Sequence, residues 1–107
     1  MRWVKLDEVR RFSSEKMVKA GLFETDRFFC DLYCCEPGQA QKPHVHPDAD
    51  KVYVVLEGRG TFRVGDEERD LGTQIAVLAP AGLEHGVVNP GPGRLILFVF
   101  MAPKPKH

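Results

Sequence analysis

The sequence predicts an all-β fold, a sandwich or barrel built from short antiparallel strands. Apolar segments recur at intervals of roughly 8–12 residues, and clusters of turn residues separate them. No segment of the 107 residues shows the apolar spacing of a convincing helix. A chain of this length has room for one hydrophobic core of ordinary size. We therefore expect residues 1–107 to form a single domain.

The first part of the chain combines an arm with two strands. Within the arm, about residues 1–15, segment 6–12 fits either a terminal strand or one helical turn. A first strand is predicted over 16–25, where Gly21 interrupts the pattern and suggests a bulge. The second strand, 27–35, is apolar on both faces. Both faces must therefore be covered, by the inside of the sandwich and a neighbouring layer or by a partner subunit. This pattern favours a homodimer.

The later part of the chain alternates between strands and turns. Glycine and proline mark the turns, and the strongest cluster is residues 89–93, Asn-Pro-Gly-Pro-Gly. The tail, 102–107, has two prolines and no apolar anchor and is predicted to be frayed and flexible. The predicted strands of this part are 52–56, 61–64, 69–71, 74–79, 84–88 and 94–101.

Composition excludes several classes of function. Fifteen Lys and Arg balance fifteen Asp and Glu, so no basic excess indicates nucleic acid or an anionic membrane surface as a partner. No apolar run approaches the roughly 20 residues that span a bilayer, and the N-terminus lacks the pattern of a secretory signal. The three cysteines, Cys30, Cys34 and Cys35, are a poor disulfide framework and are expected to be reduced and buried. Together these features predict a cytoplasmic protein.

Three histidines are candidate metal ligands. His44 and His46 are one residue apart, so on an extended chain both imidazoles project from the same face and can approach one ion. His85 lies far along the sequence, after the turn Pro80-Ala81-Gly82. Only a fold that brings distant strands together can join His85 to the pair.

At these positions the chain resembles the cupin family. The first cupin motif, G-x5-H-x-H-x(3,4)-E-x6-G, is matched by Gly38, His44, His46 and Gly58, with Lys51 where the motif has glutamate. The second motif, G-x5-P-x-G-x2-H-x3-N, is matched by Pro80, Gly82, His85 and Asn89, with Gln74 at the position of its leading glycine. The resemblance implies a double-stranded β-helix, the jelly-roll cupin barrel, which holds a divalent transition metal ion through His44, His46 and His85.

Imidazole ligands suit several such ions, and the identity among Fe, Mn, Ni, Zn and Cu stays open. Lys51 is the main departure, because an ammonium near a divalent cation is repelled. Either the pKa of Lys51 falls, or its side chain turns away, or three histidines and water hold the ion. Asp48 or Asp50 could supply an oxygen ligand, although both also fit a solvated loop. Asn89 is expected to fix a turn rather than to take part in a reaction.

A small, mostly apolar pocket is expected beside this site. Alternation from Lys51 points Tyr53 inward, where its hydroxyl could donate a hydrogen bond, act as a general acid or simply belong to a core tyrosine. The predicted lining residues are Lys51, Tyr53, Phe62, Phe98, Phe100 and Met101.

Three functions follow from this interpretation. The first is a metal-dependent enzyme acting on a small organic substrate, for which the resemblance implies oxygenase, isomerase or decarboxylase chemistry. The second is a noncatalytic module that binds or senses a small molecule or a metal. The third has no metal, and Lys51 binds a carboxylate or carbonyl of the ligand.

Overall fold

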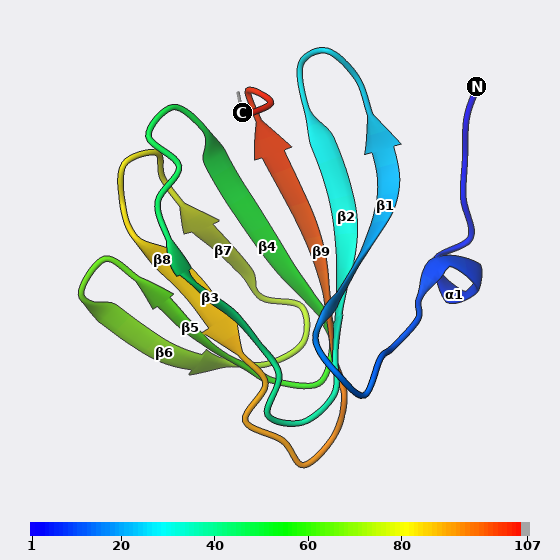
Figure 1. Ribbon diagram of the computed structural model, residues 1–107, viewed down its shortest axis with the longest axis vertical. Coiled ribbons are helices and arrows are strands. Elements are labelled where there is room, and N and C mark those ends of the chain that lie inside the picture. Colours follow the sequence, from blue (N-terminus) through cyan, green and yellow to red (C-terminus); the bar gives the residue numbers. More distant parts are fainter. Residues whose placement is uncertain (106–107) are drawn as a thin grey trace.

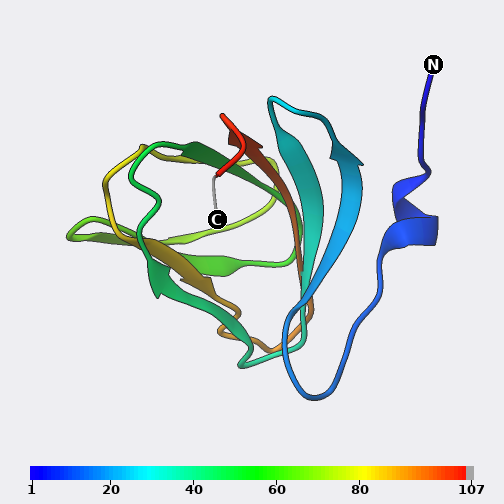
Figure 2. The same cartoon turned by 45° about the horizontal axis from the view of Figure 1, so that its top comes forward.

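The computed structural model describes residues 1–105, and its strands form two antiparallel sheets that face each other across one core (Figures 1 and 2). This confirms the predicted all-β jelly roll. The elements are α1 (Leu6–Val9), β1 (Val18–Glu24), β2 (Phe29–Cys35), β3 (Ala40–His44), β4 (Asp50–Glu57), β5 (Gly60–Val64), β6 (Glu67–Leu71), β7 (Ala76–Ala79), β8 (His85–Val88) and β9 (Leu95–Ala102).

Strands distant in sequence lie side by side in both sheets. One sheet has the order β1-β2-β9-β4-β7 and the other the order β3-β8-β5-β6. The chain passes from one sheet to the other between β2 and β3 and again between β3 and β4. This winding brings β3, which carries the first histidine, against β8, which begins with His85.

The core between the sheets is built by alternation along the strands. Tyr33 and Cys35 of β2, Tyr53 and Val55 of β4 and the odd-numbered residues of β9 all point inward, so each strand gives one apolar face to the core. The ten buried members are Tyr33, Cys35, Tyr53, Val55, Phe62, Ala79, Val87, Leu95, Leu97 and Val99. The three cysteines are free and buried, as predicted.

A second apolar cluster lies on the outer face of the five-stranded sheet. Buried Leu32, Cys34 and Ile96 pack there against Val9 and Phe12 of the N-terminal arm. The arm therefore supplies part of the second covering that a two-faced apolar strand requires. Segment 6–12, which fitted either a strand or a helical turn, contains the single turn α1, and no helix of the described residues is long and apolar enough to cross a membrane.

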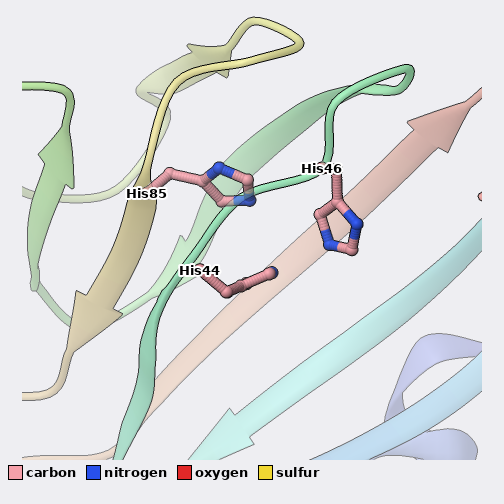
Figure 3. Close-up of side chains that lie close together, drawn as sticks. All are labelled: His44, His46 and His85. Carbon is pink, nitrogen blue, oxygen red and sulfur yellow. The ribbon is translucent and has the colours of Figure 1, made fainter.

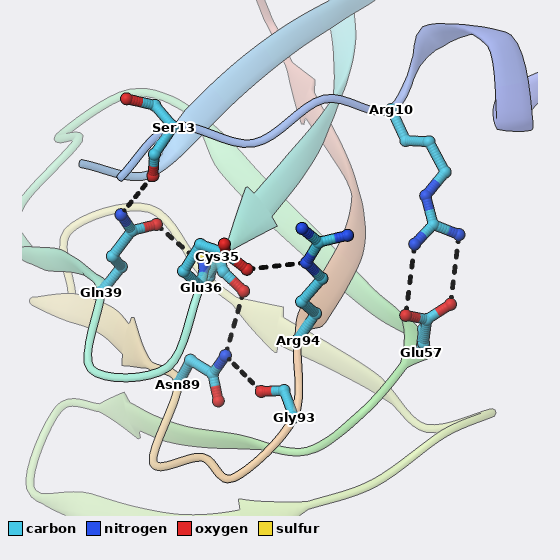
Figure 4. Close-up of polar contacts among 9 residues, drawn as sticks. All are labelled: Arg10, Ser13, Cys35, Glu36, Gln39, Glu57, Asn89, Gly93 and Arg94. Carbon is cyan, nitrogen blue, oxygen red and sulfur yellow. Dashed lines mark hydrogen bonds and ion pairs between the residues drawn. The ribbon is translucent and has the colours of Figure 1, made fainter. Parts of the chain in front are cut away.

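Polar contacts tie the arm and the turns to the sheets (Figure 4). The Arg10 guanidinium donates two hydrogen bonds to the Glu57 carboxylate, at 3.2 and 3.3 Å. Asn89, buried in the turn after β8, donates to the carbonyl oxygens of Cys35 and Gly93 at 3.0 and 2.9 Å. Its own oxygen accepts a bond from the Gly91 N–H at 2.8 Å. Asn89 thus fixes a turn, as its position in the sequence suggests.

Two positions correct or refine the sequence-based predictions. The described part of the tail is held in place, because the Lys104 N–H donates to the Arg27 carbonyl at 2.9 Å and its ammonium pairs with Glu24; residues 106–107 of the predicted flexible tail lie outside the described residues. Gln74, at the place of a motif glycine, has φ of 69°, a left-handed backbone that favours glycine.

The pairing of β3 with β8 contains an irregularity that sets the site. Gln41 pairs with Val87, but the next pair is His44 with His85, so β3 has one residue more than β8 between these points. This extra residue lets both Gln41 and His44 face the interior. Opposite it stands Gly86, where a Cβ atom would lie 2.8 Å from the Gln41 carbonyl oxygen and 3.0 Å from the Pro43 nitrogen.

We expect Gly86→Ala to lower the free energy of unfolding by about 2 kcal/mol, because backbone atoms of β3 cannot move away without breaking the pairing. Gly93→Ala is the matched control, since a Cβ there meets nothing within 4 Å. Urea unfolding of both variants measures the difference. Equal stability of the two variants would show that the close approach at Gly86 is unimportant.

Candidate metal centre

Three imidazoles from two neighbouring segments lie close together (Figure 3). Each of His44, His46 and His85 offers one ligand nitrogen, and these nitrogens all lie within 4.8 Å of one another. The centroid of the His85 ring lies 4.5 Å from that of the His44 ring and 5.6 Å from that of the His46 ring. The site therefore brings together the three residues that the sequence singles out, although His85 lies far along the chain from the other two.

Backbone carbonyls fix which nitrogen of two histidines is free. His44 Nδ1 lies 2.9 Å from the Lys42 carbonyl oxygen, and His85 Nδ1 lies 3.0 Å from that of Leu83. A carbonyl oxygen only accepts, so each Nδ1 carries the proton and each Nε2 has a free lone pair. A hydrogen bond of this kind orients a metal-binding imidazole and raises its basicity.

His85 Nε2 is the one buried side-chain nitrogen or oxygen of the described residues that has no hydrogen-bond partner. A buried polar atom without a partner is costly. A metal ion at the centre of the three rings would satisfy it, and three neutral nitrogens leave further coordination positions for water or substrate. The residues present thus fit a divalent transition metal.

Burial keeps the cluster neutral. Burial lowers the pKa of all three imidazoles. For His46, the nearby His44 ring and the Lys51 charge lower the pKa further, to about 4. Neutral imidazole is the form that binds metal. At neutral pH the three imidazoles are therefore in the form that binds metal.

Lys51 points into the barrel, so its side chain does not turn away from the site. It is 1% exposed, and its ammonium donates to the Tyr33 hydroxyl oxygen at 3.2 Å. It also lies 5.5 Å from the centre of the Tyr33 ring and 5.4 Å from that of Tyr53. Burial, aided by the charge of Lys19, lowers the pKa of Lys51 to about 7.

Gln41 completes a buried polar network that the sequence analysis missed. Its amide donates to the Tyr33 hydroxyl at 3.0 Å, and its carbonyl oxygen accepts from Tyr53 at 2.6 Å. Simple alternation from His44 would turn Gln41 outward, and the extra residue in β3 reverses this. The only sequence signal was Pro43, which cannot donate to a strand pairing and so marks a break in the ladder.

The other predicted site residues divide into two groups. Tyr53, Phe62 and Met101 are buried on the inner side, and Tyr53 is a core tyrosine bonded to Gln41. Phe98 and Phe100 were wrongly placed in the pocket, because residues of β9 alternate and these two follow the outer face. Phe98 packs in the outer cluster, and the Phe100 ring lies 5.2 Å from that of Phe28.

No carboxylate joins the histidines among the described residues, since the group that could hold an ion contains the three imidazoles alone. Asp50 instead accepts a hydrogen bond from the Ala81 N–H at 2.8 Å and so fixes the turn before β8. The structure gives no support for Asp48 or Asp50 as a replacement for the missing glutamate ligand.

This fold and site define a double-stranded β-helix protein with a histidine cluster that could bind a metal. Residues 31–101 match the family model described as "Cupin domain". The match covers well over half of the chain, and the chain belongs to the cupin family.

Two solved structures share the fold, and one further protein is similar in sequence over part of its length. The crystal structure of TT1209 from Thermus thermophilus is 46% identical, with a TM-score of 0.95 over 98% of this chain and 100% of that one. An RmlC-like cupin protein from Desulfovibrio desulfuricans is 27% identical, with a TM-score of 0.85 over 97% and 98% of the two chains. The uncharacterized protein YrkC of Bacillus subtilis is 33% identical over 69 residues, which are 59% of this chain and 37% of YrkC.

The low pKa of Lys51 makes stability depend on pH. Between roughly pH 7 and 8.5 the unfolded chain keeps the Lys51 proton while the folded protein releases it, so the free energy of unfolding rises with pH. We expect a rise of about 1.5 kcal/mol across this window, at ~1.4 kcal/mol per pH unit once the amine is neutral in the folded state. The buried thiols of Cys30 and Cys35 act in the opposite direction only as pH approaches their ordinary pKa of 9.0.

Urea unfolding at several pH values measures this dependence in wild type and in Lys51→Met, which keeps an unbranched apolar stem of four heavy atoms and removes the amine. The variant should lose the rise. An equal slope in both proteins would contradict the assignment to Lys51.

Proposed function

We propose that this cupin is a metal-dependent enzyme that acts on a small organic substrate at His44, His46 and His85. The single observation that carries the proposal is that one ligand nitrogen from each of the three imidazoles lies within 4.8 Å of the others, while His85 Nε2 is buried without a hydrogen-bond partner. When bound, a divalent ion would supply Lewis-acid activation of substrate oxygen or water.

The residues of the chain have separate parts in this proposal. His44 and His85 present Nε2 lone pairs because Lys42 and Leu83 carbonyls hold their Nδ1 protons. His46, on the loop after β3, is less buried and can adjust to the ion. The apolar core below the site excludes water from one side of the substrate.

Lys51 favours a second candidate, a noncatalytic module that binds or senses a small molecule. A basic amine stands where the first cupin motif has an anionic ligand, so the site lacks the carboxylate that would balance the charge of an ion. Incubating zinc- or iron-loaded protein with a small-molecule fraction from cells separates the two functions. Time-dependent loss of a component, absent with His85→Ala, supports an enzyme, and retention of an unchanged component supports a binding module.

Metal binding is the first test. We expect wild type to bind one Zn²⁺ or Ni²⁺ per chain in calorimetric titration and His85→Ala to bind about a hundredfold or more weakly, because the variant loses one of three ligands. His107→Ala is the matched control, since it removes the fourth histidine of the chain, which lies outside the described residues.

Elemental analysis of protein purified without added metal gives the natural ion among Fe, Mn, Ni, Zn and Cu. Metal affinity that is equal in wild type and His85→Ala would remove the basis of the proposed enzyme.

We also propose that the protein is a cytoplasmic homodimer joined through the outer face of the five-stranded sheet. Two rows of this face are apolar across paired strands: Leu78, Val52 and Phe100 in one row, and Ala76, Val54 and Phe98 in the other. Leu78 is 58% exposed, and Trp3, on the arm that extends beyond the sheets in Figure 1, is 77% exposed. A twofold axis would let the arm and face of each chain meet those of the other. The three free thiols are in keeping with a reducing compartment.

The dimer has a direct test. One chain has a mass of 12.1 kDa, and in sedimentation wild type should show twice that mass. Leu78→Glu should sediment as a monomer, because its new charge would be buried in the apolar contact. Val88→Glu introduces the same charge at an exposed position of β8, in the other sheet, and should remain dimeric. A monomeric wild type at micromolar concentration would exclude the proposed interface.

A further inference from the structure

The buried ammonium of Lys51 has too few partners. It has three N–H donors, and among the described residues its one hydrogen bond is to the Tyr33 hydroxyl oxygen. None of the ion pairs within 4.0 Å in this part of the chain includes Lys51. Two tyrosine rings near the ammonium give only part of the stabilisation that water would provide.

The hydroxyl group of Tyr33 is also short of an acceptor. Its oxygen receives hydrogen bonds from both Lys51 and Gln41, which occupy its two lone pairs. The Gln41 carbonyl oxygen accepts from Tyr53 at 2.6 Å and receives no hydrogen bond from Tyr33 or Lys51. The Tyr33 proton and two protons of the Lys51 ammonium therefore form no hydrogen bond within residues 1–105.

The charges around this network are mostly positive. Lys19 of β1 lies over the Tyr33 ring, 5.4 Å from its centre, and its charge acts on Lys51 and on His44 and His46. Asp31 is the one acidic residue whose charge acts favourably on Lys51. A divalent ion on the three histidines would add further positive charge to the same space.

We propose that Lys51 and Tyr33 form a subsite for a carboxylate group of the ligand, beside the histidine cluster. One carboxylate oxygen accepts from the Lys51 ammonium and the other from the Tyr33 hydroxyl, and the negative charge balances the buried ammonium. This inference rests on the proposed function for the location of the ligand, but it assigns a ligand class, a small organic acid, and a residue that discriminates it. Two donors suit the two oxygens of a carboxylate better than the larger charge of a phosphate, which needs more donors.

The test uses malonate as the probe, in calorimetric titrations of metal-free and zinc-loaded protein. Wild type should bind malonate in both forms. Lys51→Met should bind it about tenfold or more weakly in both forms, because a charge-assisted hydrogen bond is lost. Tyr33→Phe, which removes the hydroxyl alone, should weaken binding by a smaller factor. Lys42→Met is the matched control, since Lys42 is exposed on β3 and should leave malonate affinity unchanged.

The two proposals fail in different ways. If zinc does not bind, the proposed metal function is wrong, and the metal-free titrations still test the subsite. If zinc binds but Lys51→Met binds malonate as tightly as wild type, the subsite is wrong and the metal centre stands. Tighter binding of inorganic phosphate than of malonate would overturn the carboxylate assignment. Zinc affinity of Lys51→Met, equal to or above that of wild type, would show that the histidine cluster is intact in this variant.

Discussion

The pairing of β3 with β8 is the contact on which the site depends. The extra residue in β3 and the missing side chain at Gly86 allow the two strands to approach so closely that His44 and His85 face each other. A regular pairing would place Gln41 and His44 on opposite faces of β3, and Gln41 would then leave the interior. One irregular pair of strands therefore determines both the histidine cluster and the polar network below it.

The interior of this barrel is unusual in its charge. Three neutral imidazoles and a buried lysine stand together. Asp50 is engaged in the turn before β8, and Asp31 forms no ion pair with Lys51 among the described residues. Burial lowers the pKa of each basic group, so that the imidazoles are neutral at neutral pH while Lys51, with a pKa of about 7, keeps part of its charge. The remaining charge on Lys51 is the basis on which we propose a ligand that brings negative charge.

Alternation along the strands was a good guide wherever the pairing is regular. It placed Tyr53 inward, and the apolar pattern of β2 and β9 follows the two faces of a covered sheet. The prediction failed for Phe98 and Phe100, which were chosen for their aromatic character although they share the parity of the outward residues of β9. It also missed Gln41, because one inserted residue changes the side of every residue before it. The predicted frayed tail was wrong for its described part, since a distant backbone carbonyl at Arg27 holds Lys104.

The sequence by itself determined the class of fold, the family and the three candidate ligands, since strand periodicity, turn residues and motif spacing are local properties that can be read along the chain. Only the tertiary structure decided that Lys51 faces the site, that two histidine tautomers are fixed by backbone carbonyls, and that Tyr33 and Gln41 join the network. These features depend on distances between strands that are far apart in sequence and on how deeply each group is buried. Burial and register arise when the whole chain packs, and no local pattern contains them.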